Sequence, residues 1–585
     1  MRTRNLLTAY VLAAFLFLLF VASKQRDYAD TWVLQDVLLP TLLFVFVYSA
    51  VIVNVEDNRI VALLSASFAA ILASIAQLKY VFIYGAFDPV GHYGFTNRLI
   101  LTGHAPQVGF YADEYSAVPG THIFLGSLSM ISGLSLVDTI KLFLPIVSVM
   151  VVLIVYIASK RILSPNKQKF VLIASSFSLP IMYTLRGSVL GILFFAAIIY
   201  FLFSRAFSSE NKRAFSAMII LFIFGLIVTH GFTTIFLAVL LISSISLFRI
   251  FSFRSKVTYD LVRTNLVMPT VLLTVSFLTW WAYEARFYLY DFLVNSLQLL
   301  RVQTTVSTVS GQFFKITLFD QIEILVVRFS GYVVIGLAGL VGFVALFRFY
   351  RTRQYRIGQV IAAKHVYYIL FLFLVIMIFL AVPYVRKFQS YTLEERYVVY
   401  ALALSPFFVG MGLWGVHEFL SRRLSRFSSK GKLISKVLYV SVVFLLISAS
   451  LVQVFPCQPL VPQVEGLYVV DYRGANSIYQ REMIAFFGEH FPSDVKVSSD
   501  GMTSWQLLGL TNASFNFDYL YQQNPLVENE SLATVVLLHY GGRSGRLNEP
   551  IEYRTLEHVT EVRSGFGNSV YDNGESFVIV RATHP

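Results

Sequence analysis

Residues 188–204 have the sequence SVLGILFFAAIIYFLFS, in which no side chain carries a charge. A helix that crosses a bilayer needs about 20 predominantly apolar residues, because lipid offers its backbone no hydrogen-bond partner. The predicted spans are residues 6–23, 33–54, 60–83, 137–159, 170–185, 188–204, 215–229, 232–250, 266–283, 324–347, 366–383, 397–420 and 437–456. We therefore expect an α-helical polytopic membrane protein with about 13 transmembrane helices.

The composition of the whole chain agrees with this prediction. Of its 585 residues, 56% are hydrophobic and only 14% are charged, and the mean hydropathy is +0.68. A soluble protein of this composition would expose large apolar patches. A cytosolic enzyme, a basic nucleic-acid-binding protein and a disordered chain are therefore excluded. Cys457 is the single cysteine, so neither an internal disulfide nor a cysteine-based metal site or redox pair can form.

The basic residues predict the orientation of the spans. The net charge is +13, and lysines and arginines gather in loops at 160–169, 205–213, 249–263, 348–364 and 422–436. Cytoplasmic loops carry such an excess. All five loops fall on the inner side when the amino terminus is cytoplasmic and the number of spans is odd. The basic start MRTRN is followed by no clear cleavage site, so we expect an uncleaved first helix and a multi-pass protein of the cell membrane.

Three segments on the extracytoplasmic face are long enough to hold structure of their own: the outer loops 84–136 and 284–323, and the tail 457–585. The tail loses the apolar runs and gains alternating segments typical of strands. These segments are 467–471, 495–499, 534–539 and 576–581, with a helical stretch near 480–490. We predict a transmembrane domain over 1–456 and a small extracytoplasmic α/β domain over 457–585.

The first outer loop holds a concentration of polar side chains. Residues 84–126 have the sequence YGAFDPVGHYGFTNRLILTGHAPQVGFYADEYSAVPGTHIFLG, with three acids and three histidines. Its glycines and prolines predict several short pieces rather than one helix. Asp88 lies where an apolar run ends, and an ionisable group at that depth is a functional candidate with raised basicity. The alternative is that Asp88 and Pro89 only cap the next helix.

The motifs of this loop resemble a known superfamily. The string FDPxxHY…R at 87–98, followed by LTGHAP and YADEYSAVPGTHIFLGSLS, is similar over about 45 residues to the first outer loop of GT-C glycosyltransferases. These are polytopic enzymes that use sugars linked to polyprenyl phosphates such as dolichyl phosphate. The loop is most similar to that of the oligosaccharyltransferase catalytic subunit, and protein O-mannosyltransferases have an equivalent loop with an essential acid.

The resemblance implies roles for particular residues. Asp88 corresponds to the loop acid that activates the acceptor or helps to hold a metal. The stretch TLEERYVVYALALSPFF at 392–408 resembles the Arg-Tyr…Pro entry into a late span near the lipid phosphate, so Arg396 and Tyr397 are expected to bind the donor there. A guanidinium suits a phosphate because its donors bind oxygens in pairs. The alternative is that Arg396 pairs with Glu394 or Glu395, or extends to the membrane surface.

The chain also departs from the oligosaccharyltransferase pattern. The tail has no WWDYG motif, and WWAYE at 280–284 is assigned to the interfacial aromatic belt. Gly311 stands where a loop glutamate would be expected, and YTLRGS at 183–188 offers Arg186 in place of an acid. These departures favour a transfer to a hydroxyl, in which Asp88 takes the acceptor proton and Arg396, with Arg186, stabilises the departing lipid phosphate.

Four further residues belong to the candidate site or lie near it. We expect His92, Asp113 and Glu114 to contact the substrate, and together with Asp88 they could bind a divalent cation such as Mn²⁺ or Mg²⁺; no other cofactor is implied. His92 lies one turn from Asp88 if that stretch is helical. His230, in the turn THGFTT, is expected to cap a helix rather than to catalyse.

The expected partners are a polyprenyl-phosphate-linked sugar, a glycan or protein acceptor, and membrane lipid, with no nucleic acid. Three alternatives stay open: protein N-glycosylation as in oligosaccharyltransferases, a non-enzymatic transporter of polysaccharide or lipid, and a non-catalytic membrane partner. A transporter would need ionisable residues within its spans, or broken helices in corresponding halves. Convergence of Asp88, Arg186 and Arg396 on one outward-facing site would favour an enzyme over a transporter or a non-catalytic partner.

Overall fold

The structure is a computed structural model of the chain. It describes residues 2–25, 37–79, 83, 88–104, 116–178, 187–207, 212–251, 266–284, 400, 403, 405–424, 431–450, 485–487, 489–490, 496–499, 516–519, 535–539, 568–572 and 576–580. The predicted spans 324–347 and 366–383 and the outer loop 284–323 lie outside these residues, apart from Glu284.

Each apolar run that falls within the described residues coincides with a helix. These helices are α1 (Arg2–Ser23), α2 (Leu38–Asn54), α3 (Asn58–Lys79), α7 (Leu136–Ile162), α8 (Pro165–Ser178), α9 (Ser188–Phe207), α10 (Lys212–Thr229), α11 (Gly231–Phe251), α13 (Met268–Tyr283), α18 (Pro406–Leu424) and α19 (Gly431–Ser450). The first outer loop contributes α4 (Asp88–Thr102) and α6 (Gly120–Ser132).

The lengths of these helices bear on the membrane prediction. In the described part of the chain, four stretches are long and apolar enough to span a bilayer: Arg4–Ser23, Asn58–Lys79, Leu136–Lys160 and Gly431–Ser448. α2 and parts of α9, α10 and α11 are apolar but shorter. The chain is thus a helical membrane protein, while the total of 13 spans and the orientation of the termini stay predictions.

Local chemistry explains where the helices near the first outer loop begin and end. Ser135 caps α7, since its hydroxyl accepts a hydrogen bond from the Asp138 backbone N–H at 3.1 Å. α6 ends at Gly133, whose φ of +70° is open to glycine but costly for other residues. α4 begins at Asp88, so Pro89 falls in the first turn, where its missing N–H costs nothing.

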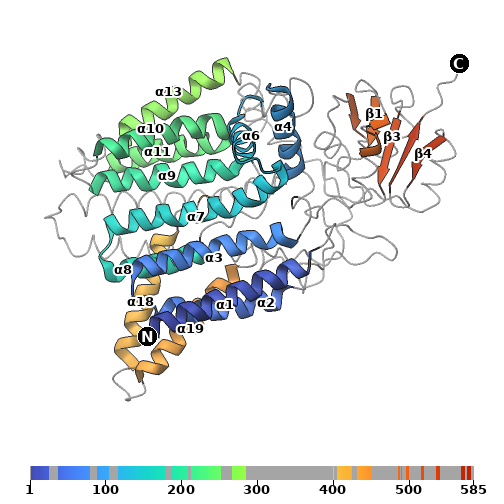
Figure 1. Ribbon diagram of the computed structural model, residues 1–585. Coiled ribbons are helices and arrows are strands. Elements are labelled where there is room, and N and C mark those ends of the chain that lie inside the picture. The colour runs from blue at the N-terminus through green and yellow to red at the C-terminus, as the bar shows by residue number, and fades with distance from the viewer. Residues whose placement is uncertain are drawn as a thin grey trace, which may run out of the picture.

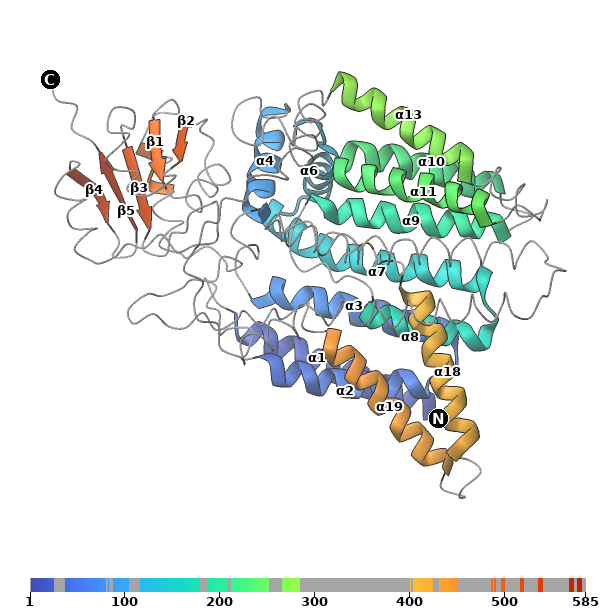
Figure 2. The ribbon, with the colours of Figure 1, turned by 180° about the vertical axis from the view of Figure 1, so that it is seen from behind.

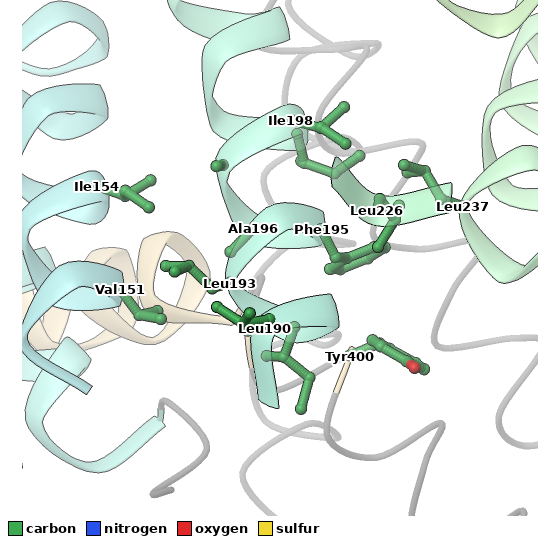
Figure 3. Packing of buried hydrophobic residues seen from close by; sticks show 14 of the residues in the cluster. Val151, Ile154, Leu190, Leu193, Phe195, Ala196, Ile198, Leu226, Leu237 and Tyr400 are labelled. Carbon is green, nitrogen blue, oxygen red and sulfur yellow. The ribbon is translucent and has the colours of Figure 1, made fainter. Parts of the chain in front are cut away.

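The helices bury apolar side chains against one another and leave others facing outward. Figure 3 shows side chains of α7, α9, α10 and α11 packed together beside Tyr400. A second buried cluster joins α1, α2, α3, α8 and α19. Because lipid is as apolar as leucine, these contacts hold the helices by close packing rather than by exclusion of water.

The bundle has two distinguishable ends. Figures 1 and 2 both place the amino terminus and the start of α8 at one end, and α4, α6 and the strands at the other. The strands are β1 (Lys496–Ser499), β2 (Asn516–Tyr519), β3 (Val535–His539), β4 (Asn568–Asp572) and β5 (Ser576–Val580). They form one sheet in the order β2-β1-β3-β5-β4. β1 is parallel to β2 and β3, and β5 is antiparallel to β3 and β4.

Three of the strands expected in the tail coincide with β1, β3 and β5, and β2 and β4 are additional. The strand expected at 467–471 lies outside the described residues. So does the boundary at 457, and the separate extracytoplasmic α/β domain therefore stays a prediction.

Candidate functional site

The part of the first outer loop that holds Asp88 and His92 is helical, which was the condition for the two residues to lie one turn apart. α4 begins at Asp88, and His92 follows four residues later, so both positions lie on one face of the helix. The His92 side chain is 1% exposed. Asp88 is thus joined by one helical turn to a histidine inside the protein.

His92 links α4 to the start of α9. The Gly187 backbone N–H donates to His92 Nε2 at 2.8 Å, and His92 Nδ1 lies 2.9 Å from His122 Nε2 in α6. A backbone N–H can only donate, so Nε2 of His92 is an acceptor and the proton of the neutral ring sits on Nδ1. His92 therefore donates to His122, whose own proton sits on Nδ1.

The surroundings of His122 keep it in this neutral form. Its side chain is 1% exposed. Burial lowers the pKa of His122 well below its ordinary value, and the neighbouring His92 lowers it further. Two neutral imidazoles in a directed hydrogen bond are the state that burial favours.

Gly187 is held from two helices at once. Besides the bond from its N–H to His92, its carbonyl oxygen accepts a hydrogen bond from Thr121 Oγ1 of α6 at 3.2 Å. A Cβ at Gly187 would lie 3.1 Å from His92 Cε1. Glycine therefore allows the chain to pass this close to the imidazole.

A second hydrogen-bonded chain runs from His230 to Tyr400. The Thr233 backbone N–H donates to His230 Nδ1 at 3.2 Å, so His230 caps the first turn of α11, as expected from the sequence. Thr233 Oγ1 lies 2.6 Å from the same nitrogen and 2.5 Å from the Tyr400 hydroxyl. Because His230 Nδ1 accepts, Thr233 donates to it and in turn accepts from Tyr400.

Both chains meet the first turn of α9. A Cβ at Gly191 would lie 3.0 Å from His230 Cβ and from Thr233 Oγ1, while Gly187 one turn earlier contacts His92. We call the set His92, His122, Gly187, Gly191, His230, Thr233 and Tyr400 the histidine junction. It joins α4, α6, α9, α11 and the residue at 400 on the end of the bundle that carries α4 and α6 (Figure 1).

The paired tryptophans lie beside this junction, and the prediction that they form an interfacial belt is wrong for Trp281. Trp281 is 1% exposed, and a Cβ at Gly231 would lie 2.8 Å from its Cζ2. Trp280 Nε1 donates to the Ala117 carbonyl oxygen at 2.8 Å, which ties α13 to the segment before α6. The absent side chain of Gly231 makes room for the Trp281 ring inside the bundle.

Two of the predicted site residues, Asp88 and His92, belong to described elements. For Asp88 the structure describes the backbone at the start of α4. The remaining predicted site residues lie outside the described residues: Asp113, Glu114, Arg186, Arg396 and Tyr397. Two residues close to them in the sequence are nonetheless in the junction, since Gly187 follows Arg186 and Tyr400 lies four residues after Arg396.

The expected metal site can be tested only in part. Among the described side chains, no three histidines, cysteines, aspartates or glutamates come together as metal ligands would. His92 accepts through one ring nitrogen and donates through the other, so this arrangement leaves it no lone pair for a metal. The side chains of the other expected ligands, Asp88, Asp113 and Glu114, lie outside the described part, so the cation site stays a prediction.

Several buried polar residues of this end of the bundle were not given a role from the sequence: His122, Thr233, Tyr400 and Lys79. The Lys79 side chain, in the last turn of α3, is fully buried. The sequence alone marks Lys79 as a candidate, because it is the single charged residue within the apolar run 60–83. Thr233 and Tyr400 carry no such signal.

Solved structures, but no family model or curated protein, are similar to this chain. No protein-family model and no curated protein matches the sequence. The chain is similar to the crystal structure of ArnT from Cupriavidus metallidurans in the apo state, with 10% identity, coverage of 89% of this chain and 97% of that chain, and a TM-score of 0.49. For the same protein bound to undecaprenyl phosphate the values are 11%, 89%, 98% and 0.49. Similarity at this level establishes neither the family of this chain nor its activity.

Proposed function

We propose that this protein is a membrane glycosyltransferase that moves a sugar from a polyprenyl phosphate carrier to a hydroxyl acceptor on the extracytoplasmic face. Asp88 is the general base, and Arg396 and Arg186 bind the lipid phosphate. Tyr397, Asp113 and Glu114 contact the substrate from neighbouring segments.

The histidine junction is the observation that carries this proposal. The Gly187–His92 hydrogen bond joins the helix that begins at Asp88 to the residue that follows Arg186. The bonds from Tyr400 through Thr233 to His230 bring in the segment that follows Arg396. The start of α4, Gly187 and Tyr400 thus lie at one end of the bundle, which supports a site there for their sequence neighbours Asp88, Arg186 and Arg396. A non-catalytic membrane partner would not require this convergence.

The proposed reaction is a direct displacement. The acceptor hydroxyl loses its proton to the Asp88 carboxylate as its oxygen forms a bond to the anomeric carbon. The bond between that carbon and the phosphate oxygen breaks, and its electron pair leaves with the polyprenyl phosphate. The two guanidinium groups stabilise the charge that develops on this phosphate. One displacement inverts the anomeric configuration.

His92 has a positioning role in this scheme. It lies one turn from Asp88, and its imidazole is fixed by a donor from Gly187 and an acceptor on His122. These bonds restrict the rotation and sliding of α4, and so fix the position from which the carboxylate acts. A direct contact between His92 and the substrate stays an expectation from the sequence.

No step of the scheme runs through a metal ion. A site for Mn²⁺ or Mg²⁺ made from Asp88, Asp113 and Glu114 remains an expectation from the sequence. Activity that survives a chelator would argue against it, and activity restored by one of these cations after chelation would support it.

The function is tested by offering the purified protein, in lipid nanodiscs, radiolabelled sugars on undecaprenyl and dolichyl phosphate. Transfer is scored separately for a lipid-linked glycan, a peptide hydroxyl and a peptide asparagine. Transfer to a hydroxyl supports the proposal, whereas transfer to asparagine alone supports the oligosaccharyltransferase alternative. Movement of the intact carrier across the bilayer without transfer supports a transporter.

The role of Asp88 is tested with Asp88→Asn, which keeps the size of the side chain and removes the base. General-base assistance contributes about 10²–10⁴-fold, so the rate of transfer should fall by that factor. Glu284→Gln is the matched control, because Glu284 is an exposed carboxylate that ends α13. Full activity of Asp88→Asn would remove Asp88 from the role of base.

A further inference from the structure

The opposite end of the bundle carries a feature that the proposed reaction does not use. The start of α8, the end of α2, α18 and the start of α19 meet near the amino terminus (Figure 2). The distribution of basic residues predicts that this end faces the cytoplasm. Lys167 and Lys169 of α8 and Lys436 of α19 gather here, and we call these three residues the lysine cluster.

Lys169 is the innermost member of the lysine cluster. Its Nζ donates to the Val53 carbonyl oxygen at 2.9 Å, in the last turn of α2. Burial lowers the pKa of Lys169 to about 8; Glu56 opposes this shift and Lys436 adds to it. An ammonium that is half desolvated and close to a second ammonium gains from a nearby anion.

Lys436 approaches the end of α2 from α19, whereas Lys167 extends from α8 toward α18. Lys436 Nζ lies 3.5 Å from Asn54 Oδ1, one residue along the chain from the carbonyl that Lys169 binds. Lys167 Nζ lies 4.3 Å from the centroid of the Trp414 ring in α18. Of the two acids close by, Glu418 pairs with Arg422, which leaves Glu56 to face Lys169.

A buried hydroxyl adds a neutral donor. Tyr439 lies one turn after Lys436 in α19 and is 2% exposed. Its ring centroid lies 5.2 Å from that of His417 and 6.0 Å from that of Phe170, next to Lys169 in the chain. Within the described part of the chain, the Tyr439 hydroxyl has no hydrogen-bond partner. A buried hydroxyl without a partner is costly, so a ligand that accepts from it is favoured.

We propose that the lysine cluster and the Tyr439 hydroxyl bind the phosphate of an anionic phospholipid of the cytoplasmic leaflet. Loop lysines that follow the positive-inside rule would remain dispersed in water. Lys169 and Lys436 instead lie on helices and converge from α8 and α19 on the end of α2, while Tyr439 with its unsatisfied hydroxyl follows Lys436 by one turn. The two ammonium groups of Lys169 and Lys436 supply the charge, and the hydroxyl supplies a directed hydrogen bond.

The proposed site predicts how binding depends on pH. Lys169 is faced by Glu56 between α2 and α3, by Lys436 in α19, and by His417 in α18, which Glu418 and Lys436 also approach. A bound phosphate stabilises the protonated amine, so binding is strongest below pH 8 and weakens as the pH rises through the Lys169 pKa of about 8.

The experiment compares the full-length protein in nanodiscs of phosphatidylcholine with nanodiscs that also contain phosphatidylglycerol. The expected results are a higher midpoint of thermal unfolding in the anionic discs and retention of phosphatidylglycerol in native mass spectrometry. A third arm adds inorganic phosphate to the phosphatidylcholine discs. An equal stabilisation by inorganic phosphate would show that a free anion, and not the lipid, is the ligand, and would overturn the proposal.

Three variants separate this site from general surface charge. Lys436→Gln removes one exposed ammonium and should weaken retention of phosphatidylglycerol roughly fivefold, whereas the matched control Lys160→Gln, at an exposed position near the end of α7, should not change it. Tyr439→Phe removes only the unsatisfied hydroxyl, so in phosphatidylcholine it should fold at least as stably as the wild type while retaining less phosphatidylglycerol. Equal retention by the Lys436→Gln and Lys160→Gln variants would overturn the proposal, independently of any result on sugar transfer.

Discussion

Two backbone N–H groups determine the direction of the hydrogen bonds in the histidine junction. A backbone N–H of Gly187 fixes the proton of His92 on Nδ1, and a backbone N–H of Thr233 makes His230 Nδ1 an acceptor. The tautomers of His92 and His230 are therefore each defined by a backbone donor. The effect of each of these residues on the stability of the protein can therefore be measured with single substitutions and as a function of pH.

The first prediction concerns the stability of the protein at low pH. Because the pKa of His122 in the folded protein lies well below its ordinary value of 6.5, the unfolded chain binds more protons in the interval between the two values. The free energy of unfolding should therefore be highest above about pH 6.5 and fall as the pH decreases below it. Thermal unfolding in detergent over this range measures the effect.

Variants assign this pH dependence to His122. His122→Asn removes the titrating group and should flatten the dependence below pH 6.5, while His104→Asn, at an exposed position, should leave it unchanged. A wild-type protein whose stability does not fall at low pH would contradict the buried neutral state of His122.

The second prediction concerns Thr233 and Tyr400. Thr233→Val leaves the buried Tyr400 hydroxyl and His230 Nδ1 without the threonine hydroxyl, and should cost about 1–3 kcal/mol of stability. Tyr400→Phe should cost less when Thr233 is already valine, because the hydrogen bond between these two hydroxyls is already lost. Unfolding midpoints of the two single variants and the double variant measure the coupling, and strictly additive losses would refute the bond.

Helices α8 and α18 approach each other closely at a glycine, whose missing side chain leaves room for the neighbouring backbone. At Gly410 in α18, a Cβ would lie 2.5 Å from the Val171 Cα of α8, a distance that backbone atoms cannot relieve by rotation. At Gly415 in the same helix, nothing lies within 4 Å of such an atom. The pair of positions separates the effect of close packing from that of helix propensity.

The third prediction uses this pair. Gly410→Ala should destabilise the protein by about 1–3 kcal/mol, because it forces α18 away from α8. Gly415→Ala should be neutral or should stabilise by up to about 1 kcal/mol, since alanine favours a helix. Unfolding midpoints under identical detergent conditions compare them, and an equal response would contradict the close contact at Gly410.

At the scale of the whole molecule, the two ends of the bundle carry different chemistry. The histidine junction lies with α4 and α6 at the end where the sheet is drawn, and the lysine cluster lies at the end with the amino terminus (Figures 1 and 2). This separation agrees with the predicted orientation, in which the basic end is cytoplasmic and the candidate reaction site faces outward.

The fourth prediction tests that orientation with the single cysteine. Cys457 lies at the predicted start of the extracytoplasmic tail, so a membrane-impermeant maleimide should label it in intact cells. A Cys457→Ser, Ser209→Cys variant moves the thiol to a predicted cytoplasmic loop and should react only after the cells are opened. The reverse pattern would place the candidate site on the wrong face of the membrane for the proposed reaction.

Residue patterns within single segments determined the helices and several strands of this protein. The length of an apolar run and the alternation of a strand are local properties, so the runs 137–159 and 188–204 were enough to place α7 and α9. The same holds for the cap that His230 provides, whereas the helix that joins Asp88 to His92 was only a condition in the sequence analysis. The motifs of the first outer loop also supplied the candidate acid, though not its neighbours.

Tertiary structure alone decided which of these segments meet. His92 and His122, or Thr233 and Tyr400, are distant along the chain, and neither composition nor periodicity shows that they form hydrogen bonds. Their pairing depends on which helices pack side by side, and in lipid that choice rests on close contacts at small residues such as Gly187, Gly191 and Gly231. The burial of Trp281, which a sequence pattern assigns to the membrane surface, was decided in the same way.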